Sequence, residues 1–154
     1  EIDILLDDQQ IWKYKNFEAK IIHIPGHTLG HVCFYFYKED SVFTGDTLFS
    51  LGCGKIFEGT YLQMFNSLMK LKKLPKDTKI FCGHEYTKQN SRFCIVHDKD
   101  NEKLKAKIND INSKLSNGLS TIPSTIQDEL DCNIFLRSES LESFSKLRDL
   151  KDNF

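Results

Sequence analysis

Three short β-prone runs in the first half of the chain are each followed by a glycine and then at once by a potential metal ligand. The runs are Phe17–Ile24, Ser41–Thr44 and Lys79–Cys82, and the ligands that follow them are His27, Asp46 and His84. Glycine lets the backbone turn tightly, and ligand sites of α/β proteins gather at the ends of strands. Imidazole and carboxylate groups suit zinc, iron or manganese. The pattern therefore predicts that these three side chains meet at one sheet edge to hold metal.

The other patterns predict an α/β part over residues 1–85, with an antiparallel or mixed sheet, and a helical part over residues 86–154. β-branched and aromatic runs indicate strands, and apolar residues that share one helical face indicate helices. The chain opens on a strand-like run, so we expect it to begin within a domain. The further elements are the strands Ile2–Leu6 and Val32–Tyr37, the helices Tyr61–Leu74, Leu104–Leu115 (stopped at Asn117-Gly118) and Glu139–Leu150, and the linker or turn Thr121–Thr125.

Composition narrows the class of protein. The chain has 154 residues, of which 40% are hydrophobic, and this is enough for one core with a small addition. The formal net charge is −1 with both signs mixed along the chain, so neither nucleic acid nor a membrane is expected as a partner. The five cysteines are odd in number and form no C-x-x-C pair, which favours free thiols in a reducing, cytoplasmic compartment.

Five motifs carry a resemblance to a known family. Pro25–His31 (PGHTLGH) and Phe43–Phe49 (FTGDTLF) resemble motifs of metallo-β-lactamase-fold hydrolases. Gly52–Gly59 (GCGKIFEG), Cys82–Thr87 (CGHEYT) and Arg148–Phe154 (RDLKDNF) resemble glyoxalase II, the hydroxyacylglutathione hydrolase. The resemblance runs through most of the chain in the right order and spacing. It implies an α+β fold, the second half of an αββα metallo-β-lactamase-like domain, followed by an all-helical substrate-binding domain.

The resemblance also implies a reaction, in which S-2-hydroxyacylglutathione, such as S-lactoylglutathione, is hydrolysed to glutathione and a 2-hydroxy acid such as D-lactate. It implies two divalent metal ions that hold a bridging hydroxide, with zinc favoured over iron or manganese. It also implies that the reaction belongs to methylglyoxal detoxification. His27 is then a ligand of the first metal, His84 of the second, and Asp46 is the catalytic carboxylate that bridges both. The residues implied in substrate binding are Lys55, Phe57 (where the family often has tyrosine), Tyr86, Arg148 and Lys151.

One element of the family pattern is absent. An H-x-H-x-D-H motif supplies the remaining ligands in this family, and it does not occur in the sequence. His31 is implied as a supporting residue, and His23 is interpreted as structural. Because a catalytic zinc normally has three protein ligands, this truncated chain alone is expected to be inactive and to need an N-terminal half. We expect a monomer whose sheet exposes an apolar flank where that half is missing.

Other hypotheses remain open. A persulfide dioxygenase of the same fold uses one iron and resembles the chain at His27 and Asp46, but that family usually has arginine in place of Lys55 and lacks the long helical domain. A non-catalytic fragment or paralogue is favoured only by the absent first-half ligands. A thiol nucleophile at Cys53 or Cys82 is disfavoured, because neither has a clear base partner and small buried thiols are common.

Overall fold

The computed structural model describes residues 2–154, which form a mixed six-stranded sheet, a separate hairpin and five helices. The order in the large sheet is β1-β2-β3-β4-β7-β8; β4 and β7 are parallel, and the other neighbours are antiparallel. β5 and β6 form the hairpin. The strands are β1 Ile11–Tyr14, β2 Phe17–His23, β3 Val32–Phe36, β4 Ser41–Gly45, β5 Leu48–Phe49, β6 Gly52–Cys53, β7 Lys79–Cys82 and β8 Ser124–Thr125.

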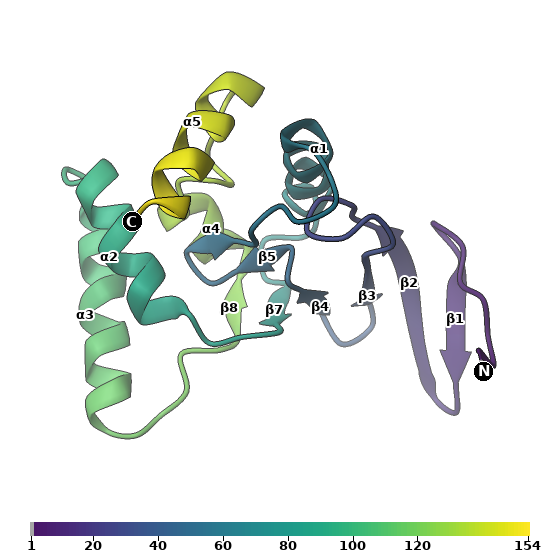
Figure 1. Cartoon of the computed structure of the whole chain (residues 1–154). Coiled ribbons are helices and arrows are strands. Elements are labelled where there is room, and N and C mark those ends of the chain that lie inside the picture. The colour runs from purple at the N-terminus through teal and green to yellow at the C-terminus, as the bar shows by residue number, and fades with distance from the viewer. Residues whose placement is uncertain (1) are drawn as a thin grey trace.

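Local signals fix the ends of several helices. Thr60 caps α1 through a reciprocal pair of bonds with Gln63, which satisfies amide groups that have no partner inside the helix. α3 ends where Gly118 adopts φ 68°, and the Leu119 N–H donates to the Lys114 carbonyl at 2.9 Å. Figure 1 shows β1 and β2 at one end of the molecule and α2, α3 and α5 at the other. The helices are α1 Tyr61–Leu71, α2 Thr87–His97, α3 Glu102–Ser116, α4 Ile126–Cys132 and α5 Leu141–Asp152.

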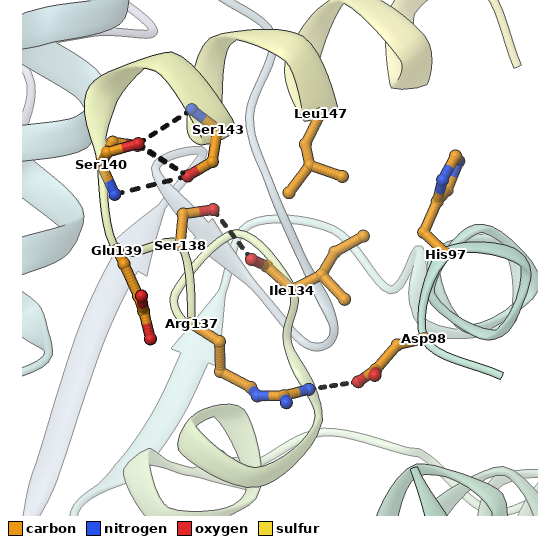
Figure 2. Close-up of a pocket in the computed structure, with 9 residues that line it drawn as sticks. All are labelled: His97, Asp98, Ile134, Arg137, Ser138, Glu139, Ser140, Ser143 and Leu147. Carbon is orange, nitrogen blue, oxygen red and sulfur yellow. Dashed lines mark hydrogen bonds and ion pairs between the residues drawn. The ribbon is translucent and has the colours of Figure 1, made fainter. Parts of the chain in front are cut away.

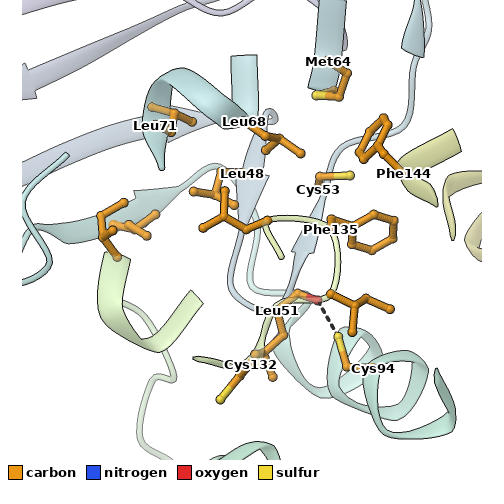
Figure 3. Close-up of a cluster of buried hydrophobic side chains, with 14 of the residues drawn as sticks. Leu48, Leu51, Cys53, Met64, Leu68, Leu71, Cys94, Cys132, Phe135 and Phe144 are labelled. Atoms are coloured by element: carbon orange, nitrogen blue, oxygen red, sulfur yellow. Dashed lines mark hydrogen bonds between the residues drawn. The ribbon is translucent and has the colours of Figure 1, made fainter. Parts of the chain in front are cut away.

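One face of the sheet packs against the helices and forms the core. Val42 of β4 and Ile80 of β7 are buried there together with Leu68 of α1. Leu48 of the hairpin and Phe135, which precedes α5, extend the same cluster (Figure 3). Burial of each such side chain contributes about 1.5–3 kcal/mol. The hairpin is therefore enclosed between the sheet and the helical part.

The opposite face of the sheet is rich in aromatic rings, of which Phe17 and Phe43 are exposed and the others half-buried. We call this surface the aromatic face, and it consists of Trp12, Phe17, Phe34, Phe36, Phe43 and Phe81. Strand register places one residue from each of four strands in a row, namely Ile21, Phe34, Phe43 and Phe81. The Phe43 side chain is 47% exposed and lines an open apolar hollow with Trp12 and two other rings. The expectation of an exposed apolar flank is confirmed.

The secondary structure differs from the sequence-based expectation in two segments. The strand predicted at Ile2–Leu6 is wrong, because within residues 2–154 no strand pairs with this segment and its Ile2, Ile4 and Leu5 side chains are exposed. β1 at Ile11–Tyr14 is the first strand instead. β8 lies inside the predicted linker Thr121–Thr125 and pairs with β7, so residues 86–154 are helical apart from this short strand.

Two structural facts bear on the cysteine and membrane expectations. The five cysteines, all of which lie within the described residues, are free thiols. No helix of residues 2–154 combines the length and the apolar character that crossing a membrane requires.

Candidate metal centre

His27, Asp46 and His84 come together just beyond the ends of β2, β4 and β7. The Nε2 atom of His27 lies 3.5 Å from Oδ2 of Asp46, and Nε2 of His84 lies 3.6 Å from Oδ1 of the same carboxylate. Their side chains are 16%, 26% and 52% exposed in chain order, so the group opens to solvent on the His84 side. The three strand-end residues therefore form one cluster, as their shared position predicts.

The nitrogen and oxygen atoms of these three side chains suit a metal ion. Shared between two ions, they give neither ion a complete set of ligands. Two ligands that each lie about 2.1 Å from a tetrahedral zinc are about 3.4 Å apart, close to both imidazole–carboxylate distances. Each carboxylate oxygen of Asp46 faces a different imidazole, so this carboxylate could contact two cations. Among residues 2–154, no group of three or more His, Cys, Asp or Glu side chains could hold one ion. Each ion would thus obtain two ligands here, and the roles of the three residues as ligands stay a prediction.

The loop from Lys55 to Glu58 fixes the orientation of His27. The Nδ1–H of His27 donates to the Lys55 carbonyl at 2.7 Å, which leaves the Nε2 lone pair directed towards Asp46. The backbone carbonyl of His27 accepts from the N–H groups of Phe57 and Glu58, both at 3.2 Å. The Glu58 carboxylate in turn accepts from the Leu29 N–H at 2.8 Å. Sequence reasoning missed Glu58, because its partner lies 29 residues away in the chain.

Close backbone approach fixes Asp46. Its N–H donates to Nε2 of His31 at 3.2 Å, consistent with the supporting role implied for this histidine. A Cβ on Gly83 would lie 2.5 Å from Oδ1 of Asp46, and a Cβ on Gly54 would lie 1.8 Å from its backbone oxygen. Both glycines are needed because the carboxylate and its peptide fill the space that a larger residue would occupy.

His84 is held by its two successors in the chain. Its ring stacks on that of Tyr86, with centroids 5.1 Å apart and planes 19° from parallel. The Glu85 carboxylate accepts from both the N–H and the hydroxyl of Thr121, and these bonds hold its pKa below its usual range. Glu85 therefore ties the His84 loop to the segment before β8. Glu85 stands in one of the quoted motifs, but its partner lies 36 residues away in sequence, so its role was missed.

The predicted substrate-binding residues fall into two groups. Lys55, Phe57 and Tyr86 are exposed beside the cluster, and the Phe57 ring lies 4.9 Å from that of His27. Arg148 is only 5% exposed, and it donates to the Cys53 carbonyl at 2.9 Å and to Asp152 at 2.8 Å. These bonds give Arg148 a structural task, whatever its role towards substrate.

Lys151 differs from Arg148, although both belong to α5. Its Nζ atom has no hydrogen-bond partner and lies about 5 Å from the ring centroids of Phe93 and Phe154. Burial, followed by the nearby positive charge of Arg148, lowers the pKa of Lys151. An unpaired ammonium group in such surroundings favours an anionic partner.

The cysteines are poor nucleophiles in these surroundings. Burial raises the pKa of the Cys53 thiol to about 11 and also raises that of Cys82. Both thiols therefore stay protonated near neutral pH, whereas a nucleophilic cysteine reacts as the thiolate.

A separate surface hollow contains none of the predicted site residues. It lies between the end of α2 and the start of α5, and Figure 2 shows the side chains that line it. Arg137 pairs with Asp98, and the Ser140 and Ser143 side chains bond to one another within the cap of α5. These four polar side chains already have partners within the protein.

Comparisons with known proteins agree with this architecture. The family model "Hydroxyacylglutathione hydrolase C-terminus" matches residues 85–154, and the model "Metallo-beta-lactamase superfamily" matches residues 16–84. The hydroxyacylglutathione hydrolase of Pelagibacter ubique is 75% identical over the whole of this chain and 64% of its own length. That of Methylococcus capsulatus is 42% identical over 95% of this chain and 57% of its own length. The chain thus spans less than two thirds of these relatives.

Solved structures show a similar fold. The crystal structure of ETHE1 from Myxococcus xanthus has a TM-score of 0.69 at 21% identity, over 96% of this chain and 52% of that one. The B3 metallo-beta-lactamase BLEG-1 has a TM-score of 0.61 at 24% identity, over 88% of this chain and 49% of that one. At these identities the likeness concerns the fold alone.

Proposed function

The chain belongs to the hydroxyacylglutathione hydrolase family of the metallo-β-lactamase superfamily, and we propose that it forms the C-terminal part of a two-metal thioesterase. The whole protein hydrolyses S-2-hydroxyacylglutathione, with S-lactoylglutathione from methylglyoxal detoxification as its typical substrate, and releases glutathione and the 2-hydroxy acid. The observation that carries this proposal is the carboxylate of Asp46, whose two oxygens face two different imidazoles at 3.5 and 3.6 Å.

The residues of this chain have separate tasks in that reaction. Two divalent ions would supply a water of lowered pKa and positive charge for the developing oxyanion. Asp46 sets the spacing of the two sites, and His27 presents Nε2 because the Lys55 carbonyl holds its Nδ1 proton. The departing glutathione thiolate is a good leaving group, with a pKa of about 8.5 for a free thiol, so no strong general acid is required.

The glutathione part of the substrate binds between the cluster and α5. Lys55, Phe57 and Tyr86 border the cluster, while Lys151 offers a buried, unpaired ammonium group. A peptide carboxylate placed against Lys151 would satisfy this group by a charge-assisted hydrogen bond. Arg148 keeps α5 attached to β6 through the Cys53 carbonyl, so its first contribution is to hold Lys151 in place.

The remaining ligands come from an N-terminal part of the whole protein. Two ligands per ion fall short of the three protein ligands that a catalytic zinc normally has. The aromatic face is where that N-terminal part packs, because an exposed apolar surface of this kind is unusual on a finished domain. Both features point to the same missing partner.

A fusion protein tests the proposal. We define it as this chain joined to the N-terminal part of the 75% identical Pelagibacter ubique relative. The fusion protein is expected to bind two equivalents of metal and to hydrolyse S-lactoylglutathione, while the chain alone binds metal weakly and does not turn over. Asp46→Asn in the fusion protein should remove metal and activity together. An active chain without the N-terminal part, or a metal-loaded but inactive fusion protein, would reject the proposal.

The same fusion protein separates the thioesterase from a mononuclear iron persulfide dioxygenase. A dioxygenase would consume oxygen with glutathione persulfide and would need one iron. We expect no oxygen uptake and full thioesterase activity with zinc.

A further inference from the structure

The turn between β5 and β6 is buried, although it is a turn. Ser50 and Leu51 are at most 1% exposed, and Leu51 has a φ of 58°, which is uncommon for a residue with a side chain. Buried backbone N–H and C=O groups need partners, and a turn of this kind cannot satisfy them through a regular ladder. The partners must therefore come from elsewhere in the molecule.

Two side chains of the α4 region bind this turn. The Glu129 Oε2 atom accepts from the Leu51 N–H at 2.8 Å. The Asn133 amide nitrogen donates to the Gly52 carbonyl at 3.0 Å and to Glu129 Oε2 at 2.8 Å. Glu129 and Asn133 are both 0% exposed, so neither bond competes with water.

Two side chains of α2 complete the set. The Asn90 amide nitrogen donates to the Ser50 carbonyl at 3.0 Å, and the Cys94 thiol donates to the Leu51 carbonyl at 3.1 Å. The turn is thus held by side chains of the helical part on more than one side.

The other end of the same hairpin is the metal cluster. β5 begins two residues after Asp46. β6 leads into Gly54, whose N–H donates to the Thr47 carbonyl at 3.2 Å, and then into Lys55, whose carbonyl orients His27. A shift of the turn would therefore reach both the carboxylate and one imidazole of the cluster.

We propose that Glu129, together with Asn133, is a positioning residue that lets the helical part set the geometry of Asp46 and His27 through the buried β5–β6 turn. The coupling to catalysis rests on the proposed thioesterase function, whereas the coupling to the cluster does not. Glu129 touches no reacting group, and it acts through the Leu51 amide.

The surroundings of Glu129 make this contact responsive to protonation. Its Oε1 atom makes no regular hydrogen bond, and the Ser124 hydroxyl of β8 lies nearby. The ionisable groups around it are the Cys82 thiol of β7, the Cys94 thiol of α2, and Asp128 and Cys132 of its own helix. Burial in these surroundings raises the pKa of Glu129 to about 7. Protonation would weaken the carboxylate as an acceptor for the Leu51 amide.

The first experiment needs no catalysis. In the chain itself, the amide proton of Leu51 should show an NMR shift that follows pH with a midpoint near 7. Glu129→Gln keeps an acceptor and should abolish this titration while the fold stays intact. Asp131→Asn, on the same helix but paired with Lys103 at the surface, is the matched control and should leave the titration unchanged. A titration that survives in Glu129→Gln, or an amide shift of Leu51 that does not respond to pH in the parent chain, would overturn the proposal.

The second experiment follows the coupling to the cluster in the fusion protein. Glu129→Ala should weaken Co²⁺ binding by about tenfold, at the lower end of the loss seen for outer-shell partners of metal ligands, and should change the cobalt absorption spectrum. Glu129→Gln keeps an acceptor for the Leu51 amide and should restore Co²⁺ binding to within about threefold. If Glu129→Ala folds and binds Co²⁺ with the parent affinity and spectrum, Glu129 is merely structural.

The two experiments also separate this inference from the proposed function. If the fusion protein lacks thioesterase activity but the Leu51 titration and the cobalt spectrum respond to Glu129 as stated, the proposed function fails and the positioning role stands. If activity is present and neither readout responds, the positioning role fails alone.

Discussion

The two faces of the sheet bury their side chains in different ways. The face towards the helices is closed, with Val42, Ile80 and Phe135 almost fully buried. On the aromatic face, Phe43 belongs to the same strand as Val42 but remains 47% exposed. Successive side chains of a strand point to opposite faces of the sheet, so β4 carries both the buried Val42 and the exposed Phe43. The sequence of this strand is therefore apolar towards both faces. The difference shows that residues 2–154 supply a covering layer for one face only.

The largest expected effect comes from a comparison of two substitutions, one of a ring in the core on the helical side of the sheet and one of a ring on the aromatic face. Phe135→Ala removes a fully buried ring that packs near Phe93 and Phe144, and it should cost about 3–5 kcal/mol of unfolding free energy. Phe43→Ala should cost less than about 1 kcal/mol in the chain alone, because the ring is half exposed. Urea unfolding measures both.

The fusion protein should reduce the difference in cost between these two substitutions. If the N-terminal part buries the aromatic face fully, Phe43→Ala should cost about 3–5 kcal/mol there, as a buried ring does. Equal costs for Phe43→Ala in the chain and in the fusion protein would mean that the aromatic face stays uncovered.

The second largest effect concerns the buried carboxyl group of Glu129 in α4. The pKa of Glu129 is about 7 in the folded protein against 4.5 for the free group. Between these values the folded state keeps the proton and the unfolded state has lost it, so stability falls as pH rises from about 4.5 to 7 and is constant above. The loss should approach about 3 kcal/mol.

The Gln variant isolates this term. Urea unfolding at several pH values should show a decline for the parent chain that is absent in Glu129→Gln, after the shared contribution of other groups is subtracted. Parallel stability profiles for the two proteins would contradict the raised pKa. No comparable titration is expected from the aromatic face, which is built from apolar rings.

Local patterns in the sequence predicted the cluster better than its supports. The strand, glycine and ligand pattern at His27, Asp46 and His84 depends on neighbours in the chain, and the structure brings the three together. Glu129 depends on Leu51, which lies 78 residues away, so no local pattern marks it. β8 was read as a linker because two residues beside Pro123 carry no strand signal of their own. The burial of Arg148 likewise depends on the distant Cys53 carbonyl.

The third largest effect concerns substrate binding by Lys151 of α5. In the fusion protein, Lys151→Ala should raise KM for S-lactoylglutathione by an amount equivalent to about 1.5–3 kcal/mol, the range for a hydrogen bond to a charged group. Metal content should stay the same, and higher salt should weaken the parent more than the variant. Arg148→Ala should raise KM too, but with a loss of stability, because it also breaks the bond to the Cys53 carbonyl. An unchanged KM for Lys151→Ala would remove α5 from substrate binding.

The smallest effect lies at the sheet edge, where the two faces meet. A Cβ on Gly83 would stand 2.5 Å from Oδ1 of Asp46, nearer than a real Cβ tolerates, so Gly83→Ala must displace the carboxylate or the His84 loop. We expect zinc affinity of the fusion protein to fall about tenfold, equivalent to about 1.4 kcal/mol, as for other changes next to metal ligands. Gly30→Ala is the matched control, because a Cβ there meets nothing within 4 Å. Competition with a chelator measures both affinities. Since Oδ1 faces His84 and Oδ2 faces His27, the loss should concern one of the two ions first, and loss of both ions in equal measure would argue against a carboxylate that serves each site with one oxygen.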